Sequence, residues 1–417
     1  MKINAKKLYF INLNLIMMVR LIGMVVPYMS VLGYIPDINN VILLFFSAKT
    51  LQRHKNRNTV RLIMAIGMLF LFDIFMFLLK GENILLFIWG MRNQYRFILF
   101  LLNTAVLLET TDIEKIFHVL YRWLMFNFLV ILIEFGAGYR RDYLGGTFGL
   151  DQNCNGVTNI FLIIISSYMI AAWLNGQEKC RKTITALGVS FLWAALAEIK
   201  IFFIEIIIIT IILTLIIKGR TLKKLQIIGL ITMGVIAGIT VLAIIFPDQI
   251  SSLSIKGLII YARHVNLGTG GFGRTTAIPM TNKLFFDGDM LLKLFGIGTG
   301  NGEMINIGRL NLQSEFYRKN SHYAYTIYFY AFIYVERGIV GLLWYFGIIC
   351  KNILRTWKIK KSSTGIIHTM SAALFSVLTC FILVMVYDGS FRVSTGGYLA
   401  FMAIAIPYVS IKDKAGK

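Results

Sequence analysis

Long apolar segments alternate with short polar gaps along most of this sequence. Because a helix needs about 20 apolar residues to cross a bilayer, the pattern predicts roughly twelve membrane-spanning helices. Those with clear limits cover residues 8–32, 35–48, 62–79, 84–108, 225–246 and 322–349. The chain is therefore expected to be an all-α, polytopic integral membrane protein.

One interval, residues 247–321, is too polar to lie in a bilayer. Charged residues recur along it, from Lys256 near its start to Lys319 near its end. A loop of this length is usually functional or disordered. Its glycine-rich sequence, which closes on NSHYAYTIYFY, favours an ordered functional loop. The predicted organisation is nine spans in 1–246, this long loop, and three spans in 322–417.

Composition agrees with a membrane protein. Hydrophobic residues make up 57% of the chain and charged residues 15%, with a mean hydropathy of +0.71, which excludes a string of soluble domains. The formal net charge is +22, which in a soluble protein would suggest a nucleic-acid partner. Here the basic residues concentrate between spans, so no nucleic acid is expected, and membrane lipids are the expected contacts.

The basic gaps also predict which side of the membrane each loop faces. Lysine and arginine concentrate in short gaps at 49–61, 179–182, 218–224 and 351–361. Short basic gaps face the cytoplasm in multi-pass proteins, whereas long loops are exempt from this rule. Alternation then places both termini in the cytoplasm. It places a short loop at 139–155 and the long loop at 247–321 outside.

Two short motifs have a turn as their ordinary interpretation. GTGGFG, at 268–273, matches the dinucleotide-binding glycine pattern but lacks the strand, helix and acidic residue that give the pattern its function. Asp287 and Asp289 have the Asp-x-Asp form of some metal sites, although Asp-Gly is a common turn dipeptide and two carboxylates are too few ligands. The four cysteines are scattered. Neither a cofactor nor a metal is therefore expected.

Charged residues within spans are costly in a bilayer, so each is a functional hypothesis. The candidates are Arg20, Asp73, Arg92, Arg96, Glu134, Lys200, Glu205, Glu336 and Arg337. Arg20, Glu134 and Arg337 are expected to contact lipid headgroups near span ends. Arg92 and Arg96 share one helix face, so they need a phosphate or acidic partners, and a break of their helix is expected near them.

Several basic residues gather at the predicted outer edges of the spans: Arg140, Arg141, Lys200, Arg274 and His322. Arginine binds phosphate oxygens in a bidentate manner, and a histidine that titrates near neutral pH can move a proton. These residues suit a phosphate-bearing substrate and an acid–base reaction. The alternative is that they contact lipid headgroups and solvent.

Segments between about residues 140 and 349 resemble motifs of the O-antigen polymerase and ligase superfamily. YLGGTFGLDQNCNG resembles its glycine-rich loop with an Asn-x-Asn pair, here Asn153 and Asn155, although Cys154 replaces the usual proline. FGRTTAI and KLFGIGTGN are similar to two further segments. NSHYAYTIYFYAFIYVERGIVG resembles the most specific one and contains Glu336. The two asparagines and Glu336 are therefore expected to support the site.

AEIKIFF stands where many members of that superfamily have a serine followed by arginine or lysine at the start of a span. Lys200 takes the basic position, while Glu198 and Ile199 depart from the small residues of the family. The resemblance implies an integral membrane glycosyltransferase of the GT-C class in a bacterial cytoplasmic membrane.

The substrate implied by this resemblance is an oligosaccharide repeat unit on undecaprenyl pyrophosphate. A polymerase joins such units at the outer face of the membrane into O-antigen, capsule or exopolysaccharide, without a nucleotide sugar or a metal. The implied partners are a chain-length regulator and a flippase. The alternatives are a ligase that transfers the chain to an acceptor, and a transporter or flippase, although the sequence lacks the related halves of many transporters.

Each step of that reaction assigns a role to particular residues. Negative charge develops on the departing pyrophosphate, and fixed guanidinium groups stabilise it. Arg274 is expected to do so catalytically, while Arg140, Arg141 and Lys200 bind the pyrophosphate. The acceptor hydroxyl needs a base that takes its proton, and His322 is expected to be that base.

Overall fold

The computed structural model describes residues 4–53, 56–152, 154–248, 257, 263, 271–307 and 310–415. Helices dominate these residues, and the strands among them form one two-stranded antiparallel hairpin. Within the same residues, eight helices are long and apolar enough to cross a membrane. The protein is therefore a helical membrane protein, as the sequence predicts.

The long helices are α1 (Ala5–Val25), α2 (Ile35–Arg53), α3 (Arg57–Lys80), α4 (Ile84–Leu107), α5 (Thr110–Gly136), α6 (Cys154–Leu174), α7 (Cys180–Leu196), α8 (Lys200–Ile216), α9 (Thr221–Ile245), α14 (Phe329–Lys361), α15 (Gly365–Tyr387) and α16 (Ser394–Ala415). Most of them are joined by short connections, whereas the long segment 246–328 separates α9 from α14. Their limits follow the predicted segments closely, but how many of them cross the bilayer stays a prediction.

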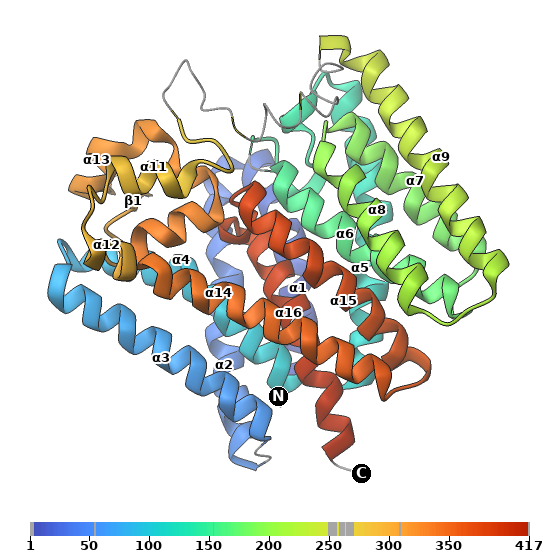
Figure 1. Ribbon diagram of the computed structural model, residues 1–417, viewed down its shortest axis with the longest axis horizontal. Coiled ribbons are helices and arrows are strands. Elements are labelled where there is room, and N and C mark those ends of the chain that lie inside the picture. Colours follow the sequence, from blue (N-terminus) through green and yellow to red (C-terminus); the bar gives the residue numbers. More distant parts are fainter. Residues whose placement is uncertain are drawn as a thin grey trace.

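Helix α6 forms the centre of the bundle. Its apolar window is completely buried, whereas only 22% of the corresponding windows of α3 and α9 is buried. Helices α7, α8, α15 and α16 pack against α6, and α3 and α9 lie at two outer edges of the molecule (Figure 1). This accounts for the sequence pattern, since α6 is apolar on all sides and has no polar face to present to water.

The predicted long loop, 247–321, contains only short elements where the structure describes it. They are α11 (Ala277–Leu284), α12 (Met290–Phe295), β1 (Met304–Ile307), β2 (Leu310–Gln313), α13 (Glu315–Asn320) and the first residues of a 3-10 turn, η5 (Ser321–Tyr323). Strands β1 and β2 pair in antiparallel register. In Figure 1 these elements gather beside the start of α14. Which side of the membrane they occupy stays a prediction.

Glu336 and Arg337 stand inside the apolar segment 322–349, so the sequence predicts two half-spans there. Helix α14 is interrupted at Gly338, in agreement with this prediction. Gly338 has φ +59°, and a Cβ atom there would lie 2.4 Å from the backbone of Leu294. The glycine-rich segment after α12 fills the break, because Ile297 N–H donates to the carbonyl of Val335 (2.9 Å) and Gly298 N–H to that of Glu336 (2.9 Å). Backbone groups freed by the break therefore regain partners.

Two expectations about the helices are wrong. Helix α14 begins at Phe329 and not at 322. Ala324 adopts φ +56° between two short 3-10 turns, η5 and η6 (Tyr325–Ile327), and this prevents the two turns from forming one continuous helix. Helix α4 is continuous through Arg92 and Arg96, where a break was expected. The reason is that both guanidinium groups meet a carboxylate, as described below.

Candidate functional site

A cavity of about 830 Å³ opens where several loops meet above α6. The segments around it are the 139–152 loop, the start of α6, the turn between α7 and α8, and the turn after α15. Its charged side chains are Asp142, Glu198, Lys200, Arg274, Glu303, Asp388 and Arg392. Cationic and acidic groups therefore share one cavity with room for a substantial polar ligand.

Arg274 lines this cavity, as expected of a phosphate-binding arginine. Its Nε donates to the carbonyl of Tyr387 (3.1 Å), and its guanidinium group lies 4.5 Å from the centre of the Tyr387 ring. The hydroxyl of Tyr330 donates to the backbone carbonyl of Arg274. Both contacts join the long loop to helices α14 and α15, so the bundle fixes the position of the guanidinium group.

Lys200 also lines the cavity, at the first position of α8. The residue is only 8% exposed, and its Nζ lies 3.1 Å from Glu198 Oε1. Glu198 adopts φ +58° in the tight turn that joins α7 to α8. The acidic residue that departs from the family pattern thus supplies a partner for the buried ammonium group, which is costly to bury alone.

Asn155 and Asn159, one turn apart on α6, form another part of the wall. Asn155 Nδ2 donates to Asp142 Oδ1 (2.6 Å) and to the carbonyl of Ala197 (2.8 Å), and Asn159 Nδ2 donates to Glu205 Oε2 (2.7 Å). The Oδ1 atoms of both asparagines are buried and receive no hydrogen bond from the described residues. They can accept hydrogen bonds from ligand hydroxyls.

Asp388 is a cavity residue that the sequence reasoning missed. Its Oδ1 accepts from the backbone N–H of Ser390 (2.8 Å) and from the Ser390 hydroxyl. Its Oδ2 faces Gly156 of α6, where a Cβ atom would lie only 2.5 Å away. Burial raises the pKa of Asp388, while the hydrogen bonds from Ser390 and the charge of Arg274 lower it to a smaller extent. One oxygen is thus anchored and the carboxyl group is oriented.

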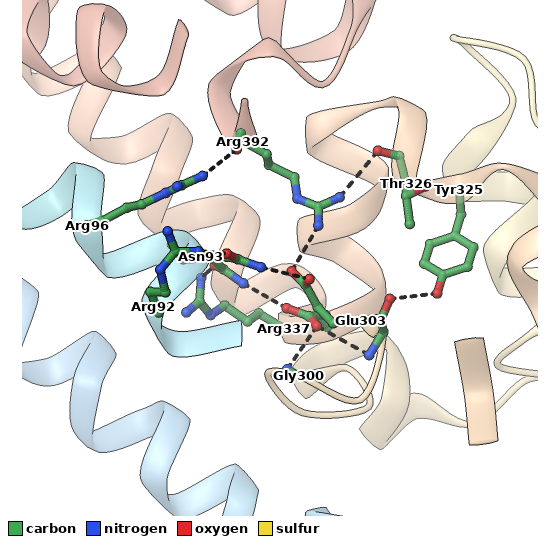
Figure 2. Close-up of polar contacts among 12 residues, drawn as sticks. Arg92, Asn93, Arg96, Gly300, Glu303, Tyr325, Thr326, Arg337 and Arg392 are labelled. Atoms are coloured by element: carbon green, nitrogen blue, oxygen red, sulfur yellow. Dashed lines mark hydrogen bonds and ion pairs between the residues drawn. The ribbon is translucent and has the colours of Figure 1, made fainter. Parts of the chain in front are cut away.

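A second pair missed by the sequence reasoning is Glu303 with Arg392. Arg392 Nη2 lies 2.9 Å from Glu303 Oε1, and its Nη1 donates to the carbonyl of Thr326 (3.3 Å). Asn93 Nδ2 of α4 donates to Glu303 Oε2 (3.0 Å). Figure 2 shows how this network joins the long loop to α4 and to the turn after α15. The signal in the sequence is Arg392, a basic residue in the polar turn DGSFRVSTG between the last two apolar segments.

Other expected site residues lie outside the wall of this cavity. His322 is exposed, and its ring packs 4.0 Å from that of Tyr323. Arg140 is exposed and donates to the carbonyls of Phe135 (2.5 Å) and Tyr139 (2.7 Å). Asn153 lies outside the described residues, as do positions 268–270 of the GTGGFG motif.

Arg141 takes an intermediate position behind the wall. Its Nε lies 3.5 Å from Glu198 Oε2, and its Nη2 lies 2.7 Å from Asp248 Oδ2. Since Glu198 also pairs with Lys200, the two predicted phosphate-binding cations share one carboxylate. Arg141 therefore reaches the cavity through Glu198 and holds the 139–152 loop against the α7–α8 turn.

Glu336 is buried and holds the glycine-rich segment that follows α12. Its Oε1 accepts from the N–H groups of Gly300 (2.9 Å) and Gly302 (3.3 Å), and its Oε2 accepts from Gln94 Nε2 (2.7 Å). Gly302 and the adjacent Glu303 line the cavity. Glu336 thus holds backbone groups beside the cavity wall, and its expected support of the site stays a prediction.

The expected headgroup contacts of Arg337 and Glu134 are wrong. Arg337 is fully buried, with Nη2 2.6 Å from Asp73 Oδ2, and Glu134 is 6% exposed and accepts from the N–H of Gly146 (2.9 Å). Arg20 pairs with Asp151 of the 139–152 loop. All three charges have protein partners: the 139–152 loop folds back onto Glu134 and Arg20, and helix α3 supplies the carboxylate that pairs with Arg337.

Arg92 and Arg96 share an acidic partner. Both guanidinium groups reach Asp37 of α2, in one case by a close contact and in the other at 3.9 Å. The Asp-Gly-Asp segment is a turn, in which Asp287 and Gly288 have positive φ and Asp289 accepts from Leu291 N–H (2.7 Å) as the N-cap of α12. The acidic partner that was expected as an alternative to phosphate is thus Asp37, and the Asp-Gly-Asp segment forms the expected turn.

No protein-family model matches this chain, and no curated protein matches it. The function is therefore argued from the cavity and from the motifs in the sequence. Of the segments that resemble a glycosyltransferase family, those around Asn155, Lys200, Arg274 and Glu303 converge on the cavity although they are far apart in the chain.

Proposed function

We propose that this protein polymerises oligosaccharide repeat units carried on undecaprenyl pyrophosphate into a surface polysaccharide. The observation that carries the proposal is the convergence of Arg274, Lys200 and Asn155 on one cavity of about 830 Å³. Each comes from a different segment of the predicted motif set. A surface polysaccharide donor needs cations for its pyrophosphate and polar groups for its sugars, and this cavity offers both.

The cationic part of the cavity suits the departing pyrophosphate. Arg274 is fixed by Tyr387, and Lys200 is held at the start of α8, where the N–H groups of the first helical turn add positive potential. Such preorganised groups stabilise charge that develops on a leaving group. Arg392 is a third cation, although its carboxylate partner Glu303 already neutralises part of its charge.

The polar part of the cavity suits the acceptor sugar. The buried Oδ1 atoms of Asn155 and Asn159 accept hydrogen bonds from sugar hydroxyls. Asp388 then takes the proton of the attacking hydroxyl, because its Oδ1 is anchored by Ser390 and its Oδ2 lies at the wall beside Gly156. His322 is the alternative base expected from the sequence, and its role stays a prediction.

The proposed reaction is a displacement at the anomeric carbon of the donor. The acceptor hydroxyl oxygen forms the new glycosidic bond, its proton passes to the base, and the bond between the anomeric carbon and the pyrophosphate oxygen breaks with its electron pair on undecaprenyl pyrophosphate. The polyprenyl chain stays in the bilayer while the sugars reach the cavity. Chemistry of this kind needs only the two lipid-linked substrates.

The proposed location is the outer face of a bacterial cytoplasmic membrane, with both termini in the cytoplasm. In support, both chain ends lie at the lower end of the molecule in Figure 1, whereas α11 and α13 lie at its upper end. The short basic connections between α2 and α3 and between α8 and α9 also belong to the lower end. A chain-length regulator and a flippase are the proposed partners.

Purified protein in liposomes tests the proposal. Lipid-linked repeat units supplied on the face that holds the cavity should grow into longer chains without nucleotide, and Arg274→Ala should abolish this growth. Transfer of the lipid-linked unit across the bilayer without any lengthening would instead identify a flippase. In cells, loss of the gene should leave single repeat units on the final acceptor, whereas full-length unattached chains would identify a ligase.

The same assay decides between the two candidate bases. If Asp388 takes the proton, Asp388→Asn loses chain growth and His322→Ala retains it. The opposite result assigns the proton transfer to His322. Binding of the lipid-linked donor, measured separately, should survive both substitutions, because neither residue is proposed to hold the pyrophosphate.

A further inference from the structure

A second cavity, of about 420 Å³, lies between the first turn of α3 and the last turns of α14. Its cationic side chains are Lys351, Arg355 and Lys358, which are spaced four and three residues apart and so share one face of α14. Asn58 of α3 and Ser362 complete the polar wall. It is separate from the first cavity, with which it shares no lining residue.

Among the described residues, no carboxylate balances the charges of this second cavity. None lines it, and no described carboxylate forms an ion pair with Lys351, Arg355 or Lys358. Arg355 contacts only neutral groups among its identified partners, donating to Asn352 Oδ1 (3.3 Å) and lying 3.8 Å from the centre of the Tyr408 ring. Like charges this close repel one another unless an anion lies between them.

Helix α3 adds to the same positive potential. Its first turn contributes Asn58 to the cavity wall, and the N-terminal end of a helix carries a partial positive charge. The preference for basic residues on the cytoplasmic side explains why the end of α14 is positively charged. It does not explain why three cations line one cavity while no described carboxylate does, and such an arrangement suits the binding of an anion.

We propose that this cavity binds the phosphate-bearing headgroup of an anionic membrane lipid. Leu354 (64% exposed) lies in its wall and Leu343 (68% exposed) lies further along the same face of α14, and α3 also exposes apolar side chains, among them Met64 (61%) and Met68 (64%). These side chains lie on apolar helices and suit acyl chains. A free phosphate ion would bind the cations but would make no contact with these apolar side chains.

Binding measurements on the purified full-length protein test the proposal. The probes are a short-chain phosphatidylglycerol, the zwitterionic phosphatidylcholine of the same chain length, and inorganic phosphate. Phosphatidylglycerol should bind and the other two should bind at least about ten-fold more weakly, since each basic residue near an anionic lipid contributes about 1 kcal/mol. The double variant Lys351→Ala/Lys358→Ala should lose this preference.

A matched double variant keeps the test specific. Lys218→Ala/Lys361→Ala removes the same charge from two exposed lysines that do not line the cavity, and it should bind phosphatidylglycerol as the unmodified protein does. Unchanged thermal unfolding midpoints establish that both variants are folded. Equal losses in the two double variants, or equal binding of the two lipids, would overturn the proposal. Equal competition by inorganic phosphate would identify a phosphate-ion site instead of a lipid site.

Discussion

At the scale of single residues, Asp388 is the side chain whose substitution separates proton transfer from binding. Asp388→Asn keeps the size of the side chain and its acceptor for the Ser390 N–H, but it removes the ability to take a proton. We expect chain growth to fall by about 10²–10⁴-fold. The exposed Glu315→Gln is the matched control and should retain activity, because it lies outside the wall of the cavity.

The pH dependence of chain growth gives a second measure of the same residue. Burial raises the pKa of Asp388, and only the deprotonated carboxylate can accept a proton. Activity should therefore decline on the acidic side as the pH falls through this raised pKa. The measurement is a rate profile of the unmodified protein and of Ser390→Ala. Ser390→Ala removes the hydrogen bond from the Ser390 hydroxyl to Asp388 and keeps the one from the backbone N–H, so the acidic limb should move to higher pH.

The sequence identifies some of these residues and misses others for a physical reason. Arg274 and Lys200 stand out as basic residues at the predicted outer edges of the spans, and Asn155 stands out because its segment resembles a glycosyltransferase motif. Asp388 and Glu303 do not, since an acidic residue in a polar turn is ordinary until folding brings it against a buried wall. Only the three-dimensional contacts assign them to the cavity.

At the scale of the elements, the break in α14 is the feature on which the neighbouring loop depends. Gly338→Ala should destabilise the protein, because alanine is strained at φ +59° and its Cβ would lie 2.4 Å from the backbone of Leu294. The control is Gly347→Ala in the same helix, where no atom lies within 4 Å of the added Cβ. Thermal unfolding in detergent should show a lower midpoint for Gly338→Ala and an unchanged or higher one for Gly347→Ala.

The ion pair of Arg337 with Asp73 connects α14 to α3 at the residue before the break. Both side chains are buried, and Arg337 Nε also donates to Asp73 Oδ1 (2.8 Å). Arg337→Ala leaves a buried carboxylate without its partner, which typically costs about 3–5 kcal/mol. We expect a large fall in the thermal midpoint. Lys319→Ala, which breaks an exposed pair with Glu315, should leave the midpoint unchanged.

Sequence reasoning finds helices more reliably than their interruptions. The break in α14 is predicted from the sequence because Glu336 and Arg337 stand inside an apolar run. The same logic failed for α4, where Arg92 and Arg96 have Asp37 of α2 as a partner that is distant in the sequence. A charge in a helix therefore indicates a need for a partner, which a break or a neighbouring helix can satisfy.

At the scale of the whole molecule, the two cavities mark opposite ends of α14. The larger one includes Thr326 and Ile327, just before the helix, and the smaller one begins at Lys351 near its other end. In the predicted topology this places sugar chemistry outside the cell and lipid-headgroup binding inside it. A single determination of sidedness therefore bears on both proposals.

Cysteine labelling in intact cells makes that determination. Cys180 and Cys350 are exposed and would first be replaced by serine. Single cysteines would then be introduced as Lys283→Cys, in α11 of the long loop, and as Lys361→Cys, at the end of α14. A membrane-impermeant maleimide should label the first variant directly and the second only after permeabilisation. The reverse pattern would place Arg274 in the cytoplasm, where no outer-face polymerase could use it, and would move the lipid-headgroup site to the outer leaflet.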